Sequence, residues 1–392
     1  MTDSKAKISF IAYYALIWMT SSIVGPYQSA FYYSKGFSAF EIGLLSSIGS
    51  VTSLLIQPCW GMINDRTKHK MGLLRLVFTV SALLILTFLL GQEYWHFIII
   101  TIIYGSFNCS VMQMSDVYTL GFINKKHLRF SYIRMSGTLG YAFSVFVLGR
   151  VLGNAELEII YIVSAVMNIL CMGMTFLLPK MDAEDYAKRV KKSKGVKGGI
   201  KEMMTPAILT ILIFSFVMQI ALSYHSTFLG VFVKQMGKSE TMIGMLQCCS
   251  ALSEVPVLLV IDWFRKKYNS YVILIFSGFM MALRMISCAL APSWGIEMLF
   301  ISQLLQGVTY MNLHYCCIMF MNEHLPEHLK GTGLALLAVA QGSAGSIVAS
   351  VGGGYLSDTF GMNTTYGIIT VLVCIASTVL WVKYKKSGEP AV

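Results

Sequence analysis

The chain has 392 residues, of which 56% are hydrophobic and only 12% are charged, and its mean hydropathy is +0.66. These values exclude an ordinary soluble domain, in which about 25% of the residues are charged. The net charge of +11 would suit nucleic acid, but the basic residues are distributed by loop as in membrane proteins, so no nucleic-acid partner is expected. The composition predicts a membrane protein that crosses the bilayer many times.

Twelve apolar stretches follow one another along the chain, and each is long enough to cross a hydrocarbon core about 30 Å thick as a helix. Polar residues interrupt this series at length only in residues 181–203, a lysine-rich segment that is read as a cytoplasmic linker or, alternatively, as a patch for anionic lipid. The predicted domains are an N-terminal six-helix bundle, residues 1–180, and a C-terminal one, residues 204–392. The stretches cover residues 8–30, 38–63, 71–91, 95–123, 130–153, 156–179, 204–232, 239–263, 270–291, 296–322, 331–357 and 363–383.

Most of the 30 lysines and arginines fall in the N-terminus, the even-numbered turns and the C-terminal tail. By the positive-inside rule this distribution places both termini in the cytoplasm, with the chain in the plasma membrane. The first apolar stretch lacks a cleavage site and reads as the first spanning helix. The nine cysteines show no zinc-ligand spacing, so neither a metal nor a cofactor is predicted.

An internal repeat supports two halves of six helices each. Gly36 recurs as Gly237 and Gly43 recurs as Gly244, both at an offset of 201 residues. Two such halves, related by an axis along the membrane normal, are a known transporter construction. The same offset relates Ser38 to Ser239, Ile42 to Ile243 and Leu45 to Leu246.

Polar side chains at helical spacing form stripes on several of the apolar stretches, and such faces belong against each other or against water. From these stripes Gln28, Gln306 and Tyr310 are taken as substrate-binding candidates. Stretches three, six and twelve carry few polar residues and are expected to face lipid, whereas stretch eleven is rich in small residues that permit close helix packing. The stripes include Tyr14 and Trp18, Ser46 and Ser50, Gln219 and Ser223, Gln247 and Glu254, and Gln303 and His314.

An acid and an arginine lie within two neighbouring apolar stretches, at Asp116 and Arg134. Thr138 and Tyr141 share a helical face with Arg134, because they follow it by four and seven residues. A charge near the bilayer centre costs about 2.5–3.5 kcal/mol and usually faces a wet pathway. Asp116, Arg134 and Tyr141 are therefore predicted to bind substrate, with a purely structural ion pair as the alternative.

A second charged group is predicted to couple transport to protons. Glu254 in stretch eight is the candidate proton carrier, with Arg284 in stretch nine and His314 in stretch ten as its neighbours. His225 is added to this set, although it lies about 200° around the helix from Ser223, a position that favours a packing role.

The segment from Gly61 to Lys70, with Asp65 and Arg66, resembles the cytoplasmic signature loop of the major facilitator superfamily, although Lys68 replaces the usual second glycine. An acid at a helix end beside a cationic turn can latch neighbouring helix ends together. The resemblance implies the major facilitator fold, an all-α membrane protein with twelve transmembrane helices in two pseudo-symmetric six-helix bundles. It also implies a conformational gating role for Gly61, Asp65, Arg66 and Lys70.

Within the superfamily, nearly the whole chain resembles the lactose-permease and phenylpropionate-permease branch. The resemblance places the sugar-binding acid and arginine of lactose permease on Asp116 and Arg134, and its stacking ring on Tyr141. Its acid in helix 8 and its arginine in helix 9 fall on Glu254 and Arg284. The text that carries this likeness includes Gly25-Pro26-Tyr27, Gln57-Pro58-Cys59-Trp60-Gly61, Ser223-Tyr224-His225, Glu254-Val255-Pro256 and His314.

The departures from lactose permease change the expected substrate and coupling. Its coupling His and Glu in helix 10 fall on Gln306 and Thr309, and its charged pair between helices 7 and 11 falls on neutral positions near Gln219 and Gly342. Lactose itself is therefore not expected, and the proton must use other carriers.

One enzyme-like match occurs, because the five residues from His324 to His328 fit the H-x-x-E-H pattern of a zinc-peptidase family. Pro326 breaks the helix that this chemistry needs, so no enzyme is predicted. The sequence predicts a monomeric proton symporter that imports a sugar, nucleoside or aromatic acid. A proton-driven exporter and a membrane sensor without transport are the alternatives.

Overall fold

The computed structural model describes residues 3–67, 69–126, 130–179, 205–326 and 329–387, and every regular element in these ranges is a helix. The first half contains α1 (Asp3–Val24), α2 (Gln28–Ser34), α3 (Ala39–Arg66), α4 (Lys70–Leu86), η1 (Thr87–Leu90), α5 (Tyr94–Asn108), α6 (Val111–Lys126), α7 (Phe130–Leu152), α8 (Ile159–Met174) and η2 (Thr175–Leu177). The second contains α11 (Pro206–Gln235), α12 (Glu240–Lys267), α13 (Ser270–Trp294), α14 (Glu297–Leu304), α15 (Gln306–His324), α16 (Lys330–Val339), η3 (Ala340–Ala344), α17 (Gly345–Phe360) and α18 (Met362–Ser387).

Eleven helical runs in the described ranges are long and apolar enough to cross a membrane. Each corresponds to one of the twelve predicted stretches. The stretch at 296–322 has no counterpart among the eleven runs; it forms α14, which ends at Leu304, and α15, which begins at Gln306. The predicted all-α membrane architecture is confirmed.

The chain divides into two compact units, and each takes in the first turns of a helix from the other half. Unit 1 comprises Met1–Phe37, Ile48–Gly195 and Ser239–Cys248. Unit 2 comprises Ser38–Ser47, Val196–Lys238 and Cys249–Val392. The beginning of α3 therefore belongs with unit 2 and the beginning of α12 with unit 1. The predicted linker, residues 181–203, lies outside the described residues.

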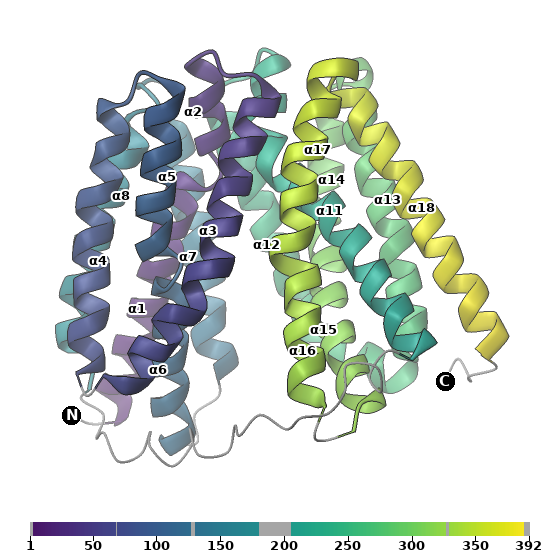
Figure 1. Ribbon diagram of the computed structural model, residues 1–392, viewed down its shortest axis with the longest axis horizontal. Helices are drawn as coiled ribbons and strands as arrows, with labels where there is room; N and C mark the ends of the chain where they lie inside the picture. Colours follow the sequence, from purple (N-terminus) through teal and green to yellow (C-terminus); the bar gives the residue numbers. More distant parts are fainter. Residues whose placement is uncertain (1–2, 68, 127–129, 180–204, 327–328, 388–392) are drawn as a thin grey trace. The chain divides into compact units, whose positions relative to one another are not determined.

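Unit 1 is built around α1, which packs along α7 and α8, while α4 packs along α8 (Figure 1). Glycines on α7 set the distance to α1, because a Cβ at Gly140 would lie 2.7 Å from the carbonyl oxygen of Ala15 and one at Gly137 would overlap the Trp18 ring. The core holds Phe10, Tyr13, Tyr14, Ile17, Leu74, Val77, Phe78 and Cys171, all nearly inaccessible.

In unit 2, α13 packs along α18 and α11 packs along α17 (Figure 1). Thr205 caps α11 by accepting a hydrogen bond from the Ile208 amide, and Pro206 occupies the first turn, where its missing N–H costs nothing. On α17, Gly353 leaves room for the ring of Tyr224, whose hydroxyl lies 2.7 Å from that of Ser357.

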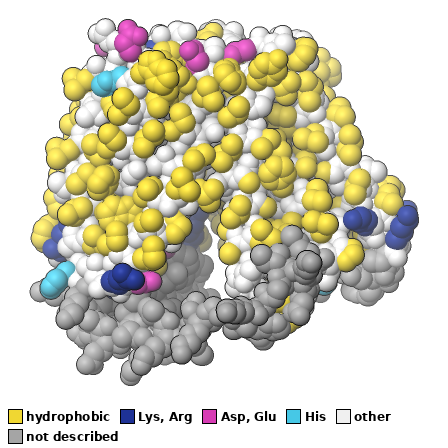
Figure 2. Space-filling model, in the orientation of Figure 1, with side chains coloured by type: hydrophobic (Ala, Val, Ile, Leu, Met, Phe, Trp, Pro, Cys, Tyr) yellow, Lys and Arg dark blue, Asp and Glu magenta, His cyan; other side chains and the backbone are white. Residues whose placement is uncertain are grey.

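The long sides of the outer helices are covered by exposed apolar side chains, whereas the charged side chains visible in Figure 2 lie near helix ends. Continuous apolar surface of this extent is typical of protein that faces lipid. It lies where the sequence predicts lipid contact, on α4, α8 and α18, and includes Leu76, Leu83, Ile162, Val166, Val371, Ile375 and Val379. The chain is a multi-pass membrane protein.

Candidate functional site

The predicted substrate pair, Asp116 and Arg134, is arranged along α1 in unit 1. Asp116 on α6 accepts a hydrogen bond from the hydroxyl of Tyr14. Arg134 on α7 lies with its guanidinium carbon 3.9 Å from the centre of the Trp18 ring, and its NH1 is 3.5 Å from the Thr138 hydroxyl. No direct Asp116–Arg134 ion pair forms among the described residues. Tyr14 and Trp18 are one helical turn apart on α1. Asp116 and Arg134 therefore contact neighbouring turns of the same helix.

The other substrate candidates of unit 1 lie on α2 and α7. The amide of Gln28 donates to the hydroxyl of Tyr32 at 2.9 Å, so part of its hydrogen-bonding capacity is used within α2. Tyr141 is half-buried on α7, two turns after Arg134. The described contacts do not join Gln28 to the group around Arg134.

In unit 2, Arg284 is the largest fully buried side chain, with 2% of its surface exposed. Its NH1 lies 3.4 Å from the hydroxyl of Thr309, and its Nε makes no hydrogen bond within the described residues. Glu254 on α12 is close enough to interact with it electrostatically. A guanidinium buried this deeply is costly unless it is paired.

The two histidines of the predicted coupling group lie in different surroundings. His225, with 3% exposed, is held in a hydrogen-bonded network. Its Nε2 is 2.8 Å from the Gln303 amide, and its Nδ1 is 3.2 Å from the Tyr366 hydroxyl and 3.6 Å from the Cys288 sulfur. These bonds suit a packing and positioning role for His225.

His314 on α15 lies instead beside Tyr310 and Gln341. The ring centres of Tyr310 and His314 are 4.4 Å apart, edge to face, and His314 Nδ1 is 2.9 Å from Gln341 Oε1. Gln306, two turns earlier on the same helix, is half-buried. Tyr310, His314 and Gln306 therefore share one region of α15, as their spacing predicts.

A crossing of α3 and α17 in unit 2 brings the two helix backbones close together. The backbone at Gly43 meets the Ser350 carbonyl so closely that any Cβ would overlap it, and a Cβ at Gly354 would lie 2.6 Å from the Ala39 carbonyl oxygen. The hydroxyl of Ser350 donates to that of Ser46 at 3.3 Å.

Asp358, which sequence reasoning missed, holds the end of this crossing. Its two carboxylate oxygens accept hydrogen bonds from the backbone amides of Ala39, at 2.9 Å, and Phe40, at 2.8 Å. Helix N-termini carry partial positive charge and unsatisfied N–H groups, so a carboxylate is well suited to cap them.

The pseudo-equivalent crossing, of α7 with the first turns of α12, lies in unit 1. A Cβ at Gly244 would lie 2.6 Å from the Val145 carbonyl oxygen, which accepts a hydrogen bond from the Tyr27 hydroxyl at 2.7 Å. The hydroxyl of Thr241 donates to the Gly149 carbonyl at 3.0 Å. Gly43 and Gly244, paired by the repeat, thus occupy equivalent close contacts.

The signature loop lies between α3, which ends at Arg66, and α4, which begins at Lys70. Asp65 and Arg66 are exposed, and a Cβ at Gly61 would meet nothing within 4 Å. Lys68 lies outside the described residues. The gating role of this loop remains a prediction.

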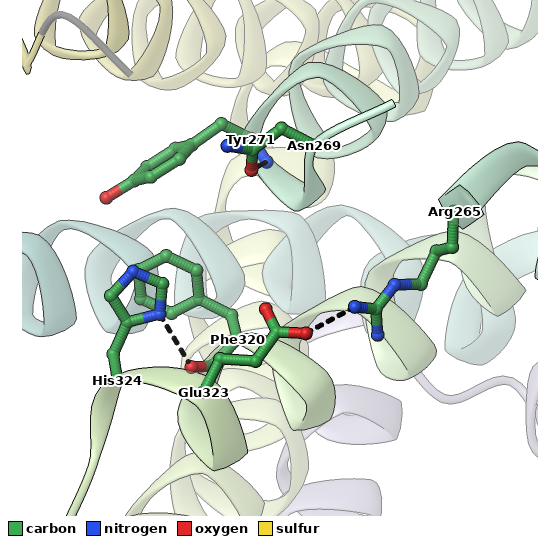
Figure 3. A network of polar contacts seen from close by, with 6 residues as sticks. All are labelled: Arg265, Asn269, Tyr271, Phe320, Glu323 and His324. Atoms are coloured by element: carbon green, nitrogen blue, oxygen red, sulfur yellow. Dashed lines mark hydrogen bonds and ion pairs between the residues drawn. The ribbon is translucent and has the colours of Figure 1, made fainter. Parts of the chain in front are cut away.

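The residues of the enzyme-like match are occupied by local contacts at the end of α15 (Figure 3). Glu323, which precedes it, forms an ion pair with Arg265 of α12. His324 stacks on Phe320, with ring centres 3.9 Å apart, and its Nδ1 is 3.0 Å from the Phe320 carbonyl oxygen. Residues 327 and 328 lie outside the described residues.

Comparisons with known proteins agree with this architecture. The model of the MFS_1 like family matches residues 5–368. The chain is 24% identical to the uncharacterized transporter YwbF of Bacillus subtilis, covering 85% of this chain and 83% of that protein. It is 21% identical to the maltose permease of Geobacillus stearothermophilus, covering 97% and 95%.

Among solved structures, that of a mutant of the nucleoside transporter NupG superposes with a TM-score of 0.85 at 14% identity, covering 96% of this chain and 99% of that chain. At this identity the likeness shows the fold alone, and that fold is the predicted one. A transporter family rather than an enzyme family is indicated. The chain belongs to the MFS_1 like family and is a major facilitator transporter.

Proposed function

We propose that the protein is a proton-coupled symporter that imports a small polar organic solute by alternating access. The observation that carries the proposal is Arg284, a guanidinium with 2% exposure inside a spanning helix and within electrostatic range of Glu254. Ionisable groups at such depth are costly and usually mark a substrate or proton pathway. The maltose permease and the nucleoside transporter among the similar proteins support a sugar or a nucleoside, and an aromatic acid is the third candidate.

The proton is carried by Glu254 in this account. A guanidinium nearby stabilises the ionised carboxylate, and burial stabilises the protonated one. Movement of Arg284 relative to Glu254 during the transport cycle therefore switches Glu254 between releasing and binding a proton. His314, whose Nδ1 is 2.9 Å from Gln341 Oε1, is the proposed second member of this proton path.

Asp116 and Arg134 hold the solute in the other half of the chain. Arg134 presents a planar set of donors, and its stacking on Trp18 keeps that plane in one orientation. Asp116 accepts hydrogen bonds from donors such as the hydroxyl groups of the solute. Tyr141, on the same face of α7, adds an aromatic surface on which a sugar or base can stack.

Alternating access needs contacts that form in one state and break in another. The α3–α17 and α7–α12 crossings are the proposed contacts on the non-cytoplasmic side. In each of them the first turns of a helix from one half of the chain, α3 or α12, contact a helix from the other half. On the cytoplasmic side, Gly61, Asp65, Arg66 and Lys70 are the proposed latch.

The loop charges support a plasma-membrane protein with both termini in the cytoplasm, and we propose that it works as a monomer. A proton-driven exporter would use the same residues, since gradients set the direction of a carrier. A sensor without transport is the remaining alternative.

Uptake by proteoliposomes tests the proposal. Purified protein is reconstituted, and radiolabelled maltose, uridine or benzoate is offered with and without an imposed pH gradient, acidic outside. We expect one of these solutes to accumulate only with the gradient. Equal accumulation with and without the pH gradient would contradict proton coupling. The absence of any protein-dependent flux would contradict transport of sugars, nucleosides and aromatic acids.

A further inference from the structure

An arginine lies on α4, a helix that the sequence predicts to face lipid. Arg75 is half-buried and follows the first residue of α4, Lys70, by five positions, within the spanning run Lys70–Leu90. Among the described residues it forms no ion pair. A cation inside a spanning segment is costly unless a counter-charge accompanies it or its side chain extends to the membrane surface.

The guanidinium of Arg75 is held against the end of α8 by three contacts. Its Nε donates to the hydroxyl of Thr175 at 2.8 Å, and its Nη2 is 3.4 Å from the carbonyl oxygen of the same residue. Its central carbon lies 3.6 Å from the centre of the Phe176 ring. The Thr175 hydroxyl donates in turn to the Met172 carbonyl at 2.6 Å, which fixes its orientation. The side chain is therefore anchored on η2 in one orientation.

These contacts leave one edge of the guanidinium available. A guanidinium has five N–H donors in one plane. Thr175 uses Nε and one N–H of Nη2, so the N–H groups of Nη1 and the other one of Nη2 have no partner in the part of the chain that the structure describes. The edge from Nη1 to Nη2 can donate to two oxygens of one phosphate group. Arg75 is thus a preoriented anion-binding group.

The surface around this group is apolar. Phe176, which stacks on the guanidinium, is 62% exposed, and the neighbouring Leu177 is 60% exposed. The two helices that carry these residues pack along each other (Figure 1), and their exposed faces continue as apolar surface. Such surface suits acyl chains, so the anion that fits here is the headgroup of a lipid. The exposed apolar residues on α4 and α8 include Leu76, Leu83, Val166, Ile169 and Leu170.

The second half of the chain has no such arginine. The helix that corresponds to α4 in the repeat is α13, and it contains no lysine or arginine from Ser270 to Leu283. The offset of 201 places Phe276, which is 52% exposed, opposite Arg75. An apolar side chain therefore meets the structural needs of this position, and the cation is a feature of the first half alone.

We propose that Arg75 binds the phosphate of one anionic phospholipid, such as phosphatidylglycerol, whose acyl chains lie along the exposed apolar side chains of α4 and α8. The phosphodiester accepts hydrogen bonds from the edge between Nη1 and Nη2, and its negative charge compensates the guanidinium. A zwitterionic lipid fits less well, because its own cation competes for the same phosphate. This site does not depend on which solute the protein transports.

The test measures lipid binding by purified full-length protein in detergent. Phosphatidylglycerol is titrated while the melting temperature is followed, and phosphatidylcholine with the same acyl chains is the control lipid. Inorganic phosphate is the third probe, because it offers the anion without the chains. The variants are Arg75→Gln and Arg75→Lys. Arg150→Gln is the matched control, since Arg150 is exposed on α7 with its guanidinium carbon 4.8 Å from the Phe146 ring centre.

We expect phosphatidylglycerol to raise the melting temperature of the wild type more than phosphatidylcholine does, and inorganic phosphate to leave it unchanged. The Kd for phosphatidylglycerol should increase about tenfold in Arg75→Gln, less in Arg75→Lys, and not at all in Arg150→Gln. Equal effects of the two lipids, an equal effect of inorganic phosphate, wild-type affinity in Arg75→Gln, or an equal loss in Arg150→Gln would overturn the site. The comparison of probes uses the unmodified protein, so it decides the question even if Arg75→Gln does not fold.

Discussion

Asp358 caps the helix that begins at Ala39, although the two residues are 319 positions apart in the chain. The local capping box of the same helix is already complete, because Ser38 and Glu41 bond each other's backbone amides at 2.9 and 3.2 Å. Asp358 satisfies the two amides that the box leaves. The start of α3 is thus fixed both by its own sequence and by a carboxylate from α17.

Replacing Asp358 by Asn is expected to loosen the α3–α17 crossing. The substitution leaves one acceptor oxygen and removes the charge that favours a helix N-terminus, a loss of about 1 kcal/mol. A Ser350→Cys reporter, buried in this crossing, should then react with a membrane-impermeant maleimide about fivefold faster. The rate is measured after subtracting the background of the native cysteines.

Thr359→Val is the matched control for Asp358→Asn. Thr359 is the next residue on α17, and within the described part of the chain its hydroxyl bonds only the carbonyl of Tyr355 in its own helix, at 2.8 Å. The reporter should react at the parent rate in this control. Equal rates in Asp358→Asn and its parent would show that the cap does not hold the crossing closed.

Arg134→Ala is expected to raise the Kd of the transported solute by more than tenfold, because it removes a charged donor set fixed on Trp18. Arg134→Lys should restore only part of the affinity, since an ammonium lacks the planar fork. The melting temperature of each unliganded variant checks that it is folded. Arg150→Ala, at the exposed end of the same helix, should bind like the wild type, and wild-type affinity in Arg134→Ala would remove this residue from the site.

The pH dependence of stability should reveal the ion pair between Lys35 and Glu158, 2.8 Å long and about one-third exposed at each side chain. The hydrogen bond from Lys35 lowers the pKa of Glu158 below its ordinary 4.5. A lowered pKa stabilises the fold above the unfolded-state value, and this contribution is lost as the pH falls through the folded-state value. Its size is at most about 1 kcal/mol for a pair this exposed.

Glu158→Gln should therefore lower the melting temperature slightly at pH 7, and the difference from wild type should vanish at pH 3. Melting curves across this range are the measurement. Glu156→Gln, two residues earlier and exposed, should show no such pH-dependent difference. If the melting temperature of Glu158→Gln stays below that of the wild type by the same amount at pH 3, the effect comes from packing instead of charge.

Glu254→Gln is expected to keep solute binding and lose gradient-driven accumulation, because glutamine cannot release a proton. Both quantities are measured on the same preparation, binding by thermal shift and accumulation in proteoliposomes. Glu297→Gln, at the exposed start of α14, is the control and should respond to the gradient like the wild type. A full response in Glu254→Gln would assign the proton to another residue.

Much of the fold follows from local sequence. Apolar length predicts the spanning helices, and the repeat predicts that Gly43 and Gly244 occupy equivalent positions, which the two helix crossings bear out. The break at Leu305 was not predicted, since hydropathy is an average that does not register one residue of altered backbone geometry. For the same reason the π-helix at Gly342 was not predicted. In the sequence, Gly342 looks like one more small residue that permits close helix packing.

The candidate site is less accessible to sequence reasoning because its contacts join distant segments. The sequence leaves open a structural ion pair of Asp116 with Arg134, but Tyr14 and Trp18 on α1 supply the contacts that each makes instead. Asp358 reads as an ordinary acid near a helix end. The signal that could have found it is the repeat, because the same offset of 201 places the apolar Leu157 opposite it and marks Asp358 as a departure from symmetry.

The most direct test of proton symport is the movement of protons driven by the solute alone. Proteoliposomes with no imposed pH gradient and with the membrane potential clamped receive external uridine or maltose, and a pH-sensitive dye reports the lightly buffered external medium. The account predicts that the solute that is transported makes the medium more alkaline, with no change in protein-free vesicles and none with Glu254→Gln. Uptake of labelled solute without any change in external pH would contradict proton coupling.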